Sequence, residues 1–113
     1  MNQSNNRYNG FTEGDWKLFR RKIAGWQEDY MGRLNEEYLA LLLKSEKSSE
    51  KFWALEKRIN RDKKRVGVII DMRRSTMIDN ILELLHDEVI EMDDLNDFSV
   101  TVKETINAYR RNF

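Results

Sequence analysis

The sequence of 113 residues has no cysteine, no proline and one histidine, and these shortages exclude several classes of function. Without cysteine there is no disulfide framework, no thiolate zinc site and no cysteine nucleophile. A single histidine cannot supply a two-histidine metal site. Basic and acidic residues are equal in number, 20 of each, which excludes a uniformly basic nucleic-acid coat and a uniformly acidic mimic of nucleic acid. The length suits one compact domain.

Long hydrophobic runs are also missing. The longest apolar runs, at 39–43 and 66–70, fall far short of the ~20 residues that a membrane helix needs. The polar start, residues 1–10, has no apolar segment of the kind found in signal peptides. We therefore expect a soluble, cytoplasmic protein without membrane contact. Its organisation is expected to be a flexible arm over residues 1–10 and a single helical domain over residues 11–113.

Many Leu, Glu, Lys and Arg residues, together with the absence of proline, favour long helices. Thr12 followed by Asp15 is typical of a helix N-terminus, with a capping side chain and an acid three residues later. From Trp16 to Leu42 the apolar residues recur in steps of three and four, which places them on one helical face. The pattern predicts a helix over about residues 13–44, with Gly25 and Gly32 as its weak points or as sites of close helix approach.

A second helix is expected after the polar connection at 44–49, capped by Ser48 or Ser49 and ending before Gly67. Its inner face is expected to hold Phe52, Leu55 and Ile59, with Trp53 beside them.

A third helix is expected over residues 68–86, although 66–70 has the composition of a buried strand. No second strand-like run is present to pair with it, so helix is favoured, while the sequence leaves helix or strand open for 66–72. The apolar residues at helical spacing here are Met72, Met77, Ile78, Ile81, Leu82 and Leu85.

Residues 87–98 are expected to form a turn and a short acidic helix, and Ser99 or Thr101 to begin the last helix. The inward residues of that helix are expected to be Val102, Ile106 and Tyr109. Together these segments predict an all-α fold, a small bundle of about four to five helices with a long N-terminal helix.

The charges balance in total but are separated along the chain. Residues 56–78 hold eight basic and three acidic groups, whereas residues 79–97 hold eight acidic groups and no basic one. Such blocks are found on solvated helix faces, on surfaces that steer a protein partner, and on surfaces that bind phosphates. The candidate acidic partner-binding residues are Asp87, Glu88, Glu91, Asp93, Asp94 and Asp97. The candidate basic residues, for nucleic acid or a partner, are Arg58, Arg61, Lys63, Lys64, Arg65, Arg73 and Arg74.

Aromatic residues at helical spacing suggest core packing more than a platform for stacked bases. Any of them that remain exposed are natural hot spots for a protein partner. These residues are Trp16, Trp26, Tyr30, Tyr38, Phe52 and Trp53.

No catalytic constellation is evident in the sequence. His86 is followed by Asp87, but no serine-nucleophile motif accompanies the pair. Asp93, Asp94 and Asp97 lack the glycine and the final glutamate that a calcium-binding EF-hand loop requires. Glycine-rich phosphate-binding motifs are missing as well. We therefore expect a protein that is not an enzyme and that needs no metal and no cofactor.

Three stretches carry a resemblance to known proteins: FTEGDWKLFRRKIAGWQEDYMGRLNEEYLALL at 11–42, SEKFWALEKRINRDKK at 49–64, and GVIIDMRRSTMIDNILELLHDEVIEMDDLNDFS at 67–99. Together they resemble a family of small soluble helical proteins of Gram-positive gut bacteria, often encoded near mobile elements. Members frequently carry the label "multidrug transporter", which the lack of a membrane segment argues against. The resemblance implies a genomic context in which accessory genes encode regulators or inhibitors of host defence.

The sequence leads to one main functional hypothesis and two alternatives. The main one is a non-enzymatic interaction protein that binds another protein stoichiometrically. An inhibitor of a defence nuclease, with acidic segment 79–97 in a basic groove, is one concrete form. The first alternative is a nucleic-acid-binding regulator that uses the basic segment 57–74. The second is self-association through the heptad-like apolar stripe on residues 16–42.

Overall fold

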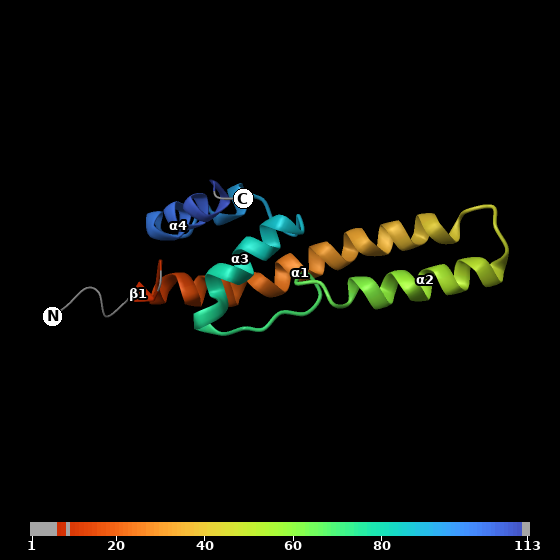
Figure 1. The fold of residues 1–113 in the computed structure, drawn as a ribbon, viewed down its shortest axis with the longest axis horizontal. Helices are drawn as coiled ribbons and strands as arrows, with labels where there is room; N and C mark the ends of the chain where they lie inside the picture. The colour runs from red at the N-terminus through yellow and green to blue at the C-terminus, as the bar shows by residue number, and fades with distance from the viewer. Residues whose placement is uncertain (1–6, 9, 112–113) are drawn as a thin grey trace.

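The computed structural model describes residues 7–8 and 10–111, and within them the protein is all-α with a long N-terminal helix (Figure 1). This confirms the predicted fold class. The elements are β1 (Arg7–Tyr8), β2 (Phe11–Thr12), α1 (Glu13–Leu42), α2 (Ser48–Asp62), the 3-10 turn η2 (Arg74–Thr76), α3 (Met77–His86), the 3-10 turn η3 (Met92–Leu95) and α4 (Val100–Arg111).

Helix α1 begins as the sequence predicts. The Thr12 hydroxyl accepts a hydrogen bond from the Asp15 backbone N–H at 3.1 Å, and the Asp15 carboxylate accepts one from the Thr12 N–H at 2.9 Å. This reciprocal capping box satisfies two backbone groups that a helix start otherwise leaves open. The helix then continues to Leu42, so the predicted span of about 13–44 is confirmed.

The expected N-terminal arm lies mostly outside the described residues. Of it, Arg7–Tyr8 form a short antiparallel pair with Phe11–Thr12, in which Tyr8 stands opposite Phe11. Gly10 makes the turn at φ 96°, a backbone conformation that favours glycine. A Cβ atom at Gly10 would also come within 2.6 Å of the Thr105 hydroxyl of α4. The end of the arm is therefore held between α1 and α4.

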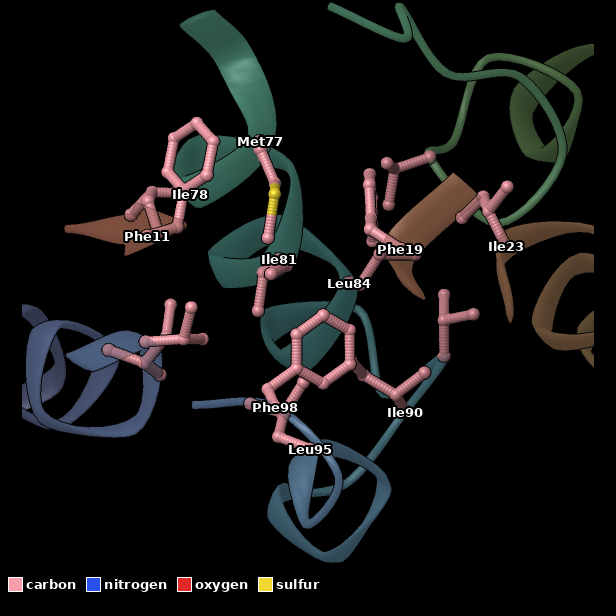
Figure 2. Packing of buried hydrophobic residues seen from close by; sticks show 14 of the residues in the cluster. Phe11, Phe19, Ile23, Met77, Ile78, Ile81, Leu84, Ile90, Leu95 and Phe98 are labelled. Atoms are coloured by element: carbon pink, nitrogen blue, oxygen red, sulfur yellow. The ribbon is translucent and has the colours of Figure 1, made fainter. Parts of the chain in front are cut away.

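The hydrophobic core lies at the N-terminal end of α1, where α3 and α4 pack against it (Figures 1 and 2). Predicted core positions of α3 are confirmed, since Met77, Ile78 and Ile81 are buried. Leu82 and Leu85 are only partly buried, and Leu84, which is not among the predicted core positions, is fully buried. The most deeply buried apolar side chains are Phe11, Phe19, Met77, Ile81, Leu84, Leu95, Val102 and Ile106.

The molecule is elongated because α1 extends well beyond this core. Its dimensions are 67 × 25 × 19 Å and its radius of gyration is 17.6 Å. A compact chain of this length has a radius of about 13 Å. Figure 1 shows that the C-terminal end of α1, beyond the contacts of Tyr30 and Arg33, lies beside α2 as a projecting helical hairpin.

The third helix is shorter than predicted. It begins at Met77 rather than at residue 68, and residues 66–72 are neither helix nor strand. The reason is that this segment crosses α1. The Gln27 side-chain amide donates to the Val66 carbonyl at 3.1 Å, and Gly67 lies directly against the Tyr30 ring. A single turn forms, in which the Ile69 N–H donates to the Arg65 carbonyl at 2.9 Å, but the contacts of Val66 and Gly67 with α1 keep the segment on its crossing path, and the next α-helix begins only at Met77.

Further expectations about helix ends and faces are corrected. Helix α2 starts at Ser48, but Lys47 is its N-cap and makes no side-chain capping bond. Phe52 and Ile59, predicted to face inward, are exposed, because α2 has only α1 beside it. Tyr109 is also exposed. The last helix is capped as expected, since the Ser99 hydroxyl accepts from the Val102 N–H at 3.2 Å.

We predict opposite effects of alanine at two kinds of glycine. A Cβ at Gly67 would lie 2.2 Å from Tyr30 Cδ2, so Gly67→Ala should lower the free energy of unfolding by about 1–3 kcal/mol through overpacking. Gly25 and Gly32 lie inside α1, and a Cβ atom at either position would have nothing within 4 Å. No other helix therefore approaches α1 closely at these two glycines.

Gly25→Ala is therefore the matched control and should raise the free energy of unfolding by about 0.5–1 kcal/mol. Urea unfolding followed by circular dichroism measures both changes. Equal stability of the two variants would contradict the packing of Gly67 on Tyr30.

Candidate interaction surface on the helical hairpin

The hairpin of α1 and α2 is closed at its tip by a lysine. The Lys51 ammonium of α2 donates to the backbone carbonyls of Leu42 and Lys44 at 2.9 and 3.3 Å. These carbonyls lie at the C-terminal end of α1, where backbone acceptors lack helical partners and the helix dipole favours a positive charge. The tip is thus built from the end of one helix and the first turns of the next.

The base of the hairpin is held by a buried carboxylate. Asp62 is 1% exposed, and its carboxylate accepts a hydrogen bond from the Tyr38 hydroxyl of α1 at 2.7 Å. Three arginines surround the same carboxylate: Arg61 at 3.1 Å, Arg58 at 3.6 Å and Arg65 at 3.7 Å. Because a buried charge is costly unless it is paired, this cluster fixes how α2 sits on α1.

The ion-pair network extends from Asp62 in both directions. Arg58 also pairs with Glu37 of α1 at 2.6 Å, and its guanidinium lies 5.6 Å from the centre of the Tyr38 ring. Arg65 also approaches Asp87, which follows α3, at 3.8 Å. The network therefore links α1, α2 and the end of α3.

The network changes the ionisation of its buried members. Burial raises the pKa of the Asp62 carboxyl, but the Tyr38 hydroxyl and the neighbouring arginines outweigh burial and hold that pKa below its usual value. Burial and the hydrogen bond to Asp62 raise the pKa of Tyr38 to about 12. At neutral pH the pair is therefore a charged carboxylate and a neutral phenol.

The two sides of the hairpin differ in chemistry. Leu34, Tyr38 and Leu41 of α1 are buried or half-buried, which makes them the line that faces α2. At about 100° per residue, Leu39 and Leu42 are rotated to one side of that line. Glu37, which pairs with Arg58, is rotated to the other side.

Helix α2 repeats the division. Leu55, Arg58 and Asp62 face α1, and from that line Phe52 and Ile59 are rotated in the same sense as the leucines of α1. Since the helices run antiparallel, the same sense of rotation leads to the same side of the hairpin. One side carries the ion-pair network, and the other carries Leu39, Leu42, Phe52 and Ile59. Trp53, about 100° beyond Phe52, continues this apolar surface onto the outer face of α2, and the five residues together are called the apolar flank.

The apolar flank is open to solvent. Phe52 and Trp53 are 62% and 63% exposed, and their rings meet edge to face with centroids 4.9 Å apart. Leu39 is 56% exposed, and Leu42 and Ile59 are exposed as well. A large aromatic side chain has a surface of about 150–250 Å², and roughly half of each of the five side chains is exposed. The flank therefore presents on the order of 600 Å² of apolar surface. Patches of this size on a monomer are often functional.

The other four aromatic residues of the predicted set pack in the core or against it, as the helical spacing indicates. Trp16 and Tyr30 are buried, and Trp26 and Tyr38 are partly buried. Ring contacts at 6.1–6.3 Å run from Trp16 through Phe19 and Trp26 to Phe98, which places these rings in the core. Phe52 and Trp53 are thus the members of the predicted set that remain exposed.

The seven candidate basic residues do not converge on one open face. Arg58, Arg61 and Arg65 surround Asp62. Arg73 pairs with Asp71, and Arg74 forms a two-point pair with Glu13 at the start of α1. Lys63 and Lys64 are exposed.

Several of the candidate acidic residues already have structural roles. The Asp94 carboxylate accepts from the Glu91 N–H at 2.8 Å and caps η3. Asp97 pairs with Lys22 at 3.6 Å, and Asp87 approaches Arg65. Glu88 and Asp93 are exposed.

Glu88 holds an uncommon backbone conformation. Its φ of 60° ends α3 in a left-handed turn in which the Val89 N–H donates to the Leu84 carbonyl at 2.9 Å. The Arg33 guanidinium donates to the Glu88 and Val89 carbonyls at 3.0 and 3.1 Å. This arrangement explains how a residue other than glycine is kept in the turn.

His86 is exposed, in a groove of about 420 Å³ between α3 and α4 that Leu82, Leu85 and Arg110 also line. Among residues 7–8 and 10–111, no group of three or more histidine or acidic side chains is arranged to hold a metal ion. No helix in the same described residues is long and apolar enough to cross a membrane.

Comparison of the chain with protein-family models, curated proteins and solved structures gives no match.

We predict that Asp62 stabilises the protein in a pH-dependent way. Asp62→Asn should lower the free energy of unfolding by about 2 kcal/mol at pH 7, because three arginines lose their shared counter-charge. The pKa of Asp62 is lower in the folded protein than in the unfolded chain. Its contribution is therefore present above about pH 4 and is lost as the pH falls below that value.

Urea unfolding at pH 7 and at pH 2.5 measures this difference, which should shrink at the lower pH. The matched control is Asp71→Asn, because the Asp71 carboxylate pairs with Arg73 on the surface, and it should change stability by less than about 0.5 kcal/mol. An Asp62→Asn penalty that is unchanged at pH 2.5 would count against the network.

Proposed function

We propose that the protein is a non-enzymatic interaction module that binds a protein partner stoichiometrically through the apolar flank of its hairpin. The observation that carries the proposal is the exposure of Phe52 and Trp53 on a projecting part of the molecule. Aromatic side chains are enriched at the hot spots of protein interfaces, where their burial contributes much of the affinity. An apolar surface of this size favours burial against another protein over continued exposure to water.

The rigidity of the hairpin supports the same function. Lys51 fixes its tip and the Asp62 network fixes its base, so the flank is held in place before any partner arrives. A preorganised surface loses little conformational entropy on binding. The ion pairs occupy the opposite side and leave the apolar flank free of them.

A photo-crosslinking amino acid at position 53 tests the proposal in cells that produce the protein. We expect covalent adducts between this position and a protein, of whatever identity. The matched control is the same amino acid at Val100, which is 66% exposed but lies at the start of α4, away from the hairpin. Protein adducts at position 53 with none at position 100 are the expected result, and no adduct at position 53 would contradict the proposed function.

An acidic surface supports a more specific form of partner binding, inhibition of an enzyme with a basic groove. Exposed Asp93 and Asp97 suit such a groove, whereas Asp94 caps η3 and should be left in place. We predict that Asp93→Lys with Asp97→Lys weakens binding to such a partner about 10-fold or more without unfolding the protein.

Affinity capture of basic, nuclease-type proteins by the wild type and by this double variant measures the effect. If the folded double variant captures these proteins as well as the wild type does, the inhibitor hypothesis is wrong.

The nucleic-acid-binding alternative has less support. Arg58, Arg61 and Arg65 share the buried Asp62, and Arg73 and Arg74 each pair with an acid, so these five cations are partly neutralised. Phosphate binding would have to compete with these existing pairs.

A further inference from the structure

We propose that the partner of the apolar flank is a second copy of this chain, and that two hairpins pack flank to flank into a four-helix bundle. The inference rests on the proposed function, because it names the occupant of the same surface. The two observations that carry it are the architecture of the hairpin and the area of the flank.

The architecture fits because a helical hairpin is half of a four-helix bundle. Antiparallel helices that are exposed on one apolar side reach a complete core when a second hairpin covers that side. In the monomer, Leu55 is only half-buried between the two helices, and Phe52 and Ile59 beside it are exposed. A second hairpin would cover all of these positions together.

The area also fits a pair of copies. A standard interface buries roughly 800 Å² on each partner. The flank provides on the order of 600 Å² from five side chains, and neighbouring backbone and polar atoms lie within the same footprint. Homodimer interfaces are more apolar than interfaces between proteins that associate transiently, which is the character of this flank.

The charges do not oppose such a pairing. The ion-pair network lies on the other side of the hairpin. Between Phe52 and Ile59, Glu56 is the charged residue on the side of the flank. A two-fold axis along the hairpins places α1 of one copy over α2 of the other, so the two Glu56 side chains do not face each other.

The molar mass of the purified full-length chain in solution tests the proposal directly. Light scattering or sedimentation equilibrium over a range of concentrations should show a transition from 13.6 kDa to twice that mass. Phe52→Ser with Trp53→Ser should raise the dimer dissociation constant at least about 30-fold, since both aromatic rings leave the interface. Leu39→Arg should have the same effect from α1, because each copy would then bury a charged side chain against an apolar surface.

The matched control is Ile69→Ser with Val100→Ser. These residues are 65% and 66% exposed, as apolar as the pair that is replaced, and lie outside the hairpin. This control should keep the dimer constant of the wild type. Circular dichroism should show that all variants retain their helices, because the replaced side chains are exposed in the monomer.

Each outcome decides. A dimer that the flank variants abolish and the control leaves intact supports the proposal. A chain that remains at 13.6 kDa up to the highest concentration, or a dimer that the flank variants leave intact, overturns it. If position 53 then still crosslinks to a different protein in cells, the proposed function stands and only the identity of the partner is wrong.

Discussion

The length of α1 relative to the core is the constraint on which the rest of the structure depends. A helix of 30 residues is about 45 Å long. The short elements that follow α2, namely α3, η3 and α4, cover its N-terminal part with a continuous core. Its C-terminal part has only α2 beside it, and two helices alone cannot bury apolar residues on more than their shared line. An elongated molecule with an open apolar flank follows directly.

At the compact end, a single carboxylate links segments that are far apart in the chain. Asp15 accepts hydrogen bonds from the Thr12 N–H, the Thr12 hydroxyl, the Ser99 N–H and the Ser99 hydroxyl, at 2.7–3.0 Å. It therefore joins the first turn of α1 to the residue that caps α4, 84 positions later in the chain. Burial raises the pKa of Asp15, but these bonds outweigh burial and hold the pKa below its usual value. The charge that remains at neutral pH supports the start of α1 through the helix dipole.

Local signals in the sequence predict the helices well. The capping pair Thr12 and Asp15, the regular apolar steps of α1 and the start of the last helix all appear in the structure, because each depends on neighbours within a few residues. The arrangement of α2 was not predictable in the same way. Its apolar stripe at Phe52 and Ile59 is typical of an inner face, and only the three-dimensional structure shows that no element among the described residues covers it.

The buried Asp62 was missed for a similar reason. In the sequence it is one acid in a basic stretch, Arg61 to Arg65, and nothing marks it as buried. A tyrosine at position 38 provides its closest bond, and a contact between residues 24 apart leaves no periodic signal. The end of the second helix before Gly67 was predicted correctly, whereas the crossing of residues 66–72 over Tyr30 depends on long-range packing.

The hairpin is the part of the molecule suited to a partner. Lys51 closes its tip and Asp62 its base, ion pairs lie on one side, and apolar residues lie on the other. Amide hydrogen exchange of the purified chain at increasing concentration tests the pairing of two such hairpins most directly. It predicts slower exchange in residues 39–42 and 52–59 as the concentration rises, with no change in α4. Exchange in the hairpin that is independent of concentration, or protection that appears in α4 instead, would contradict it.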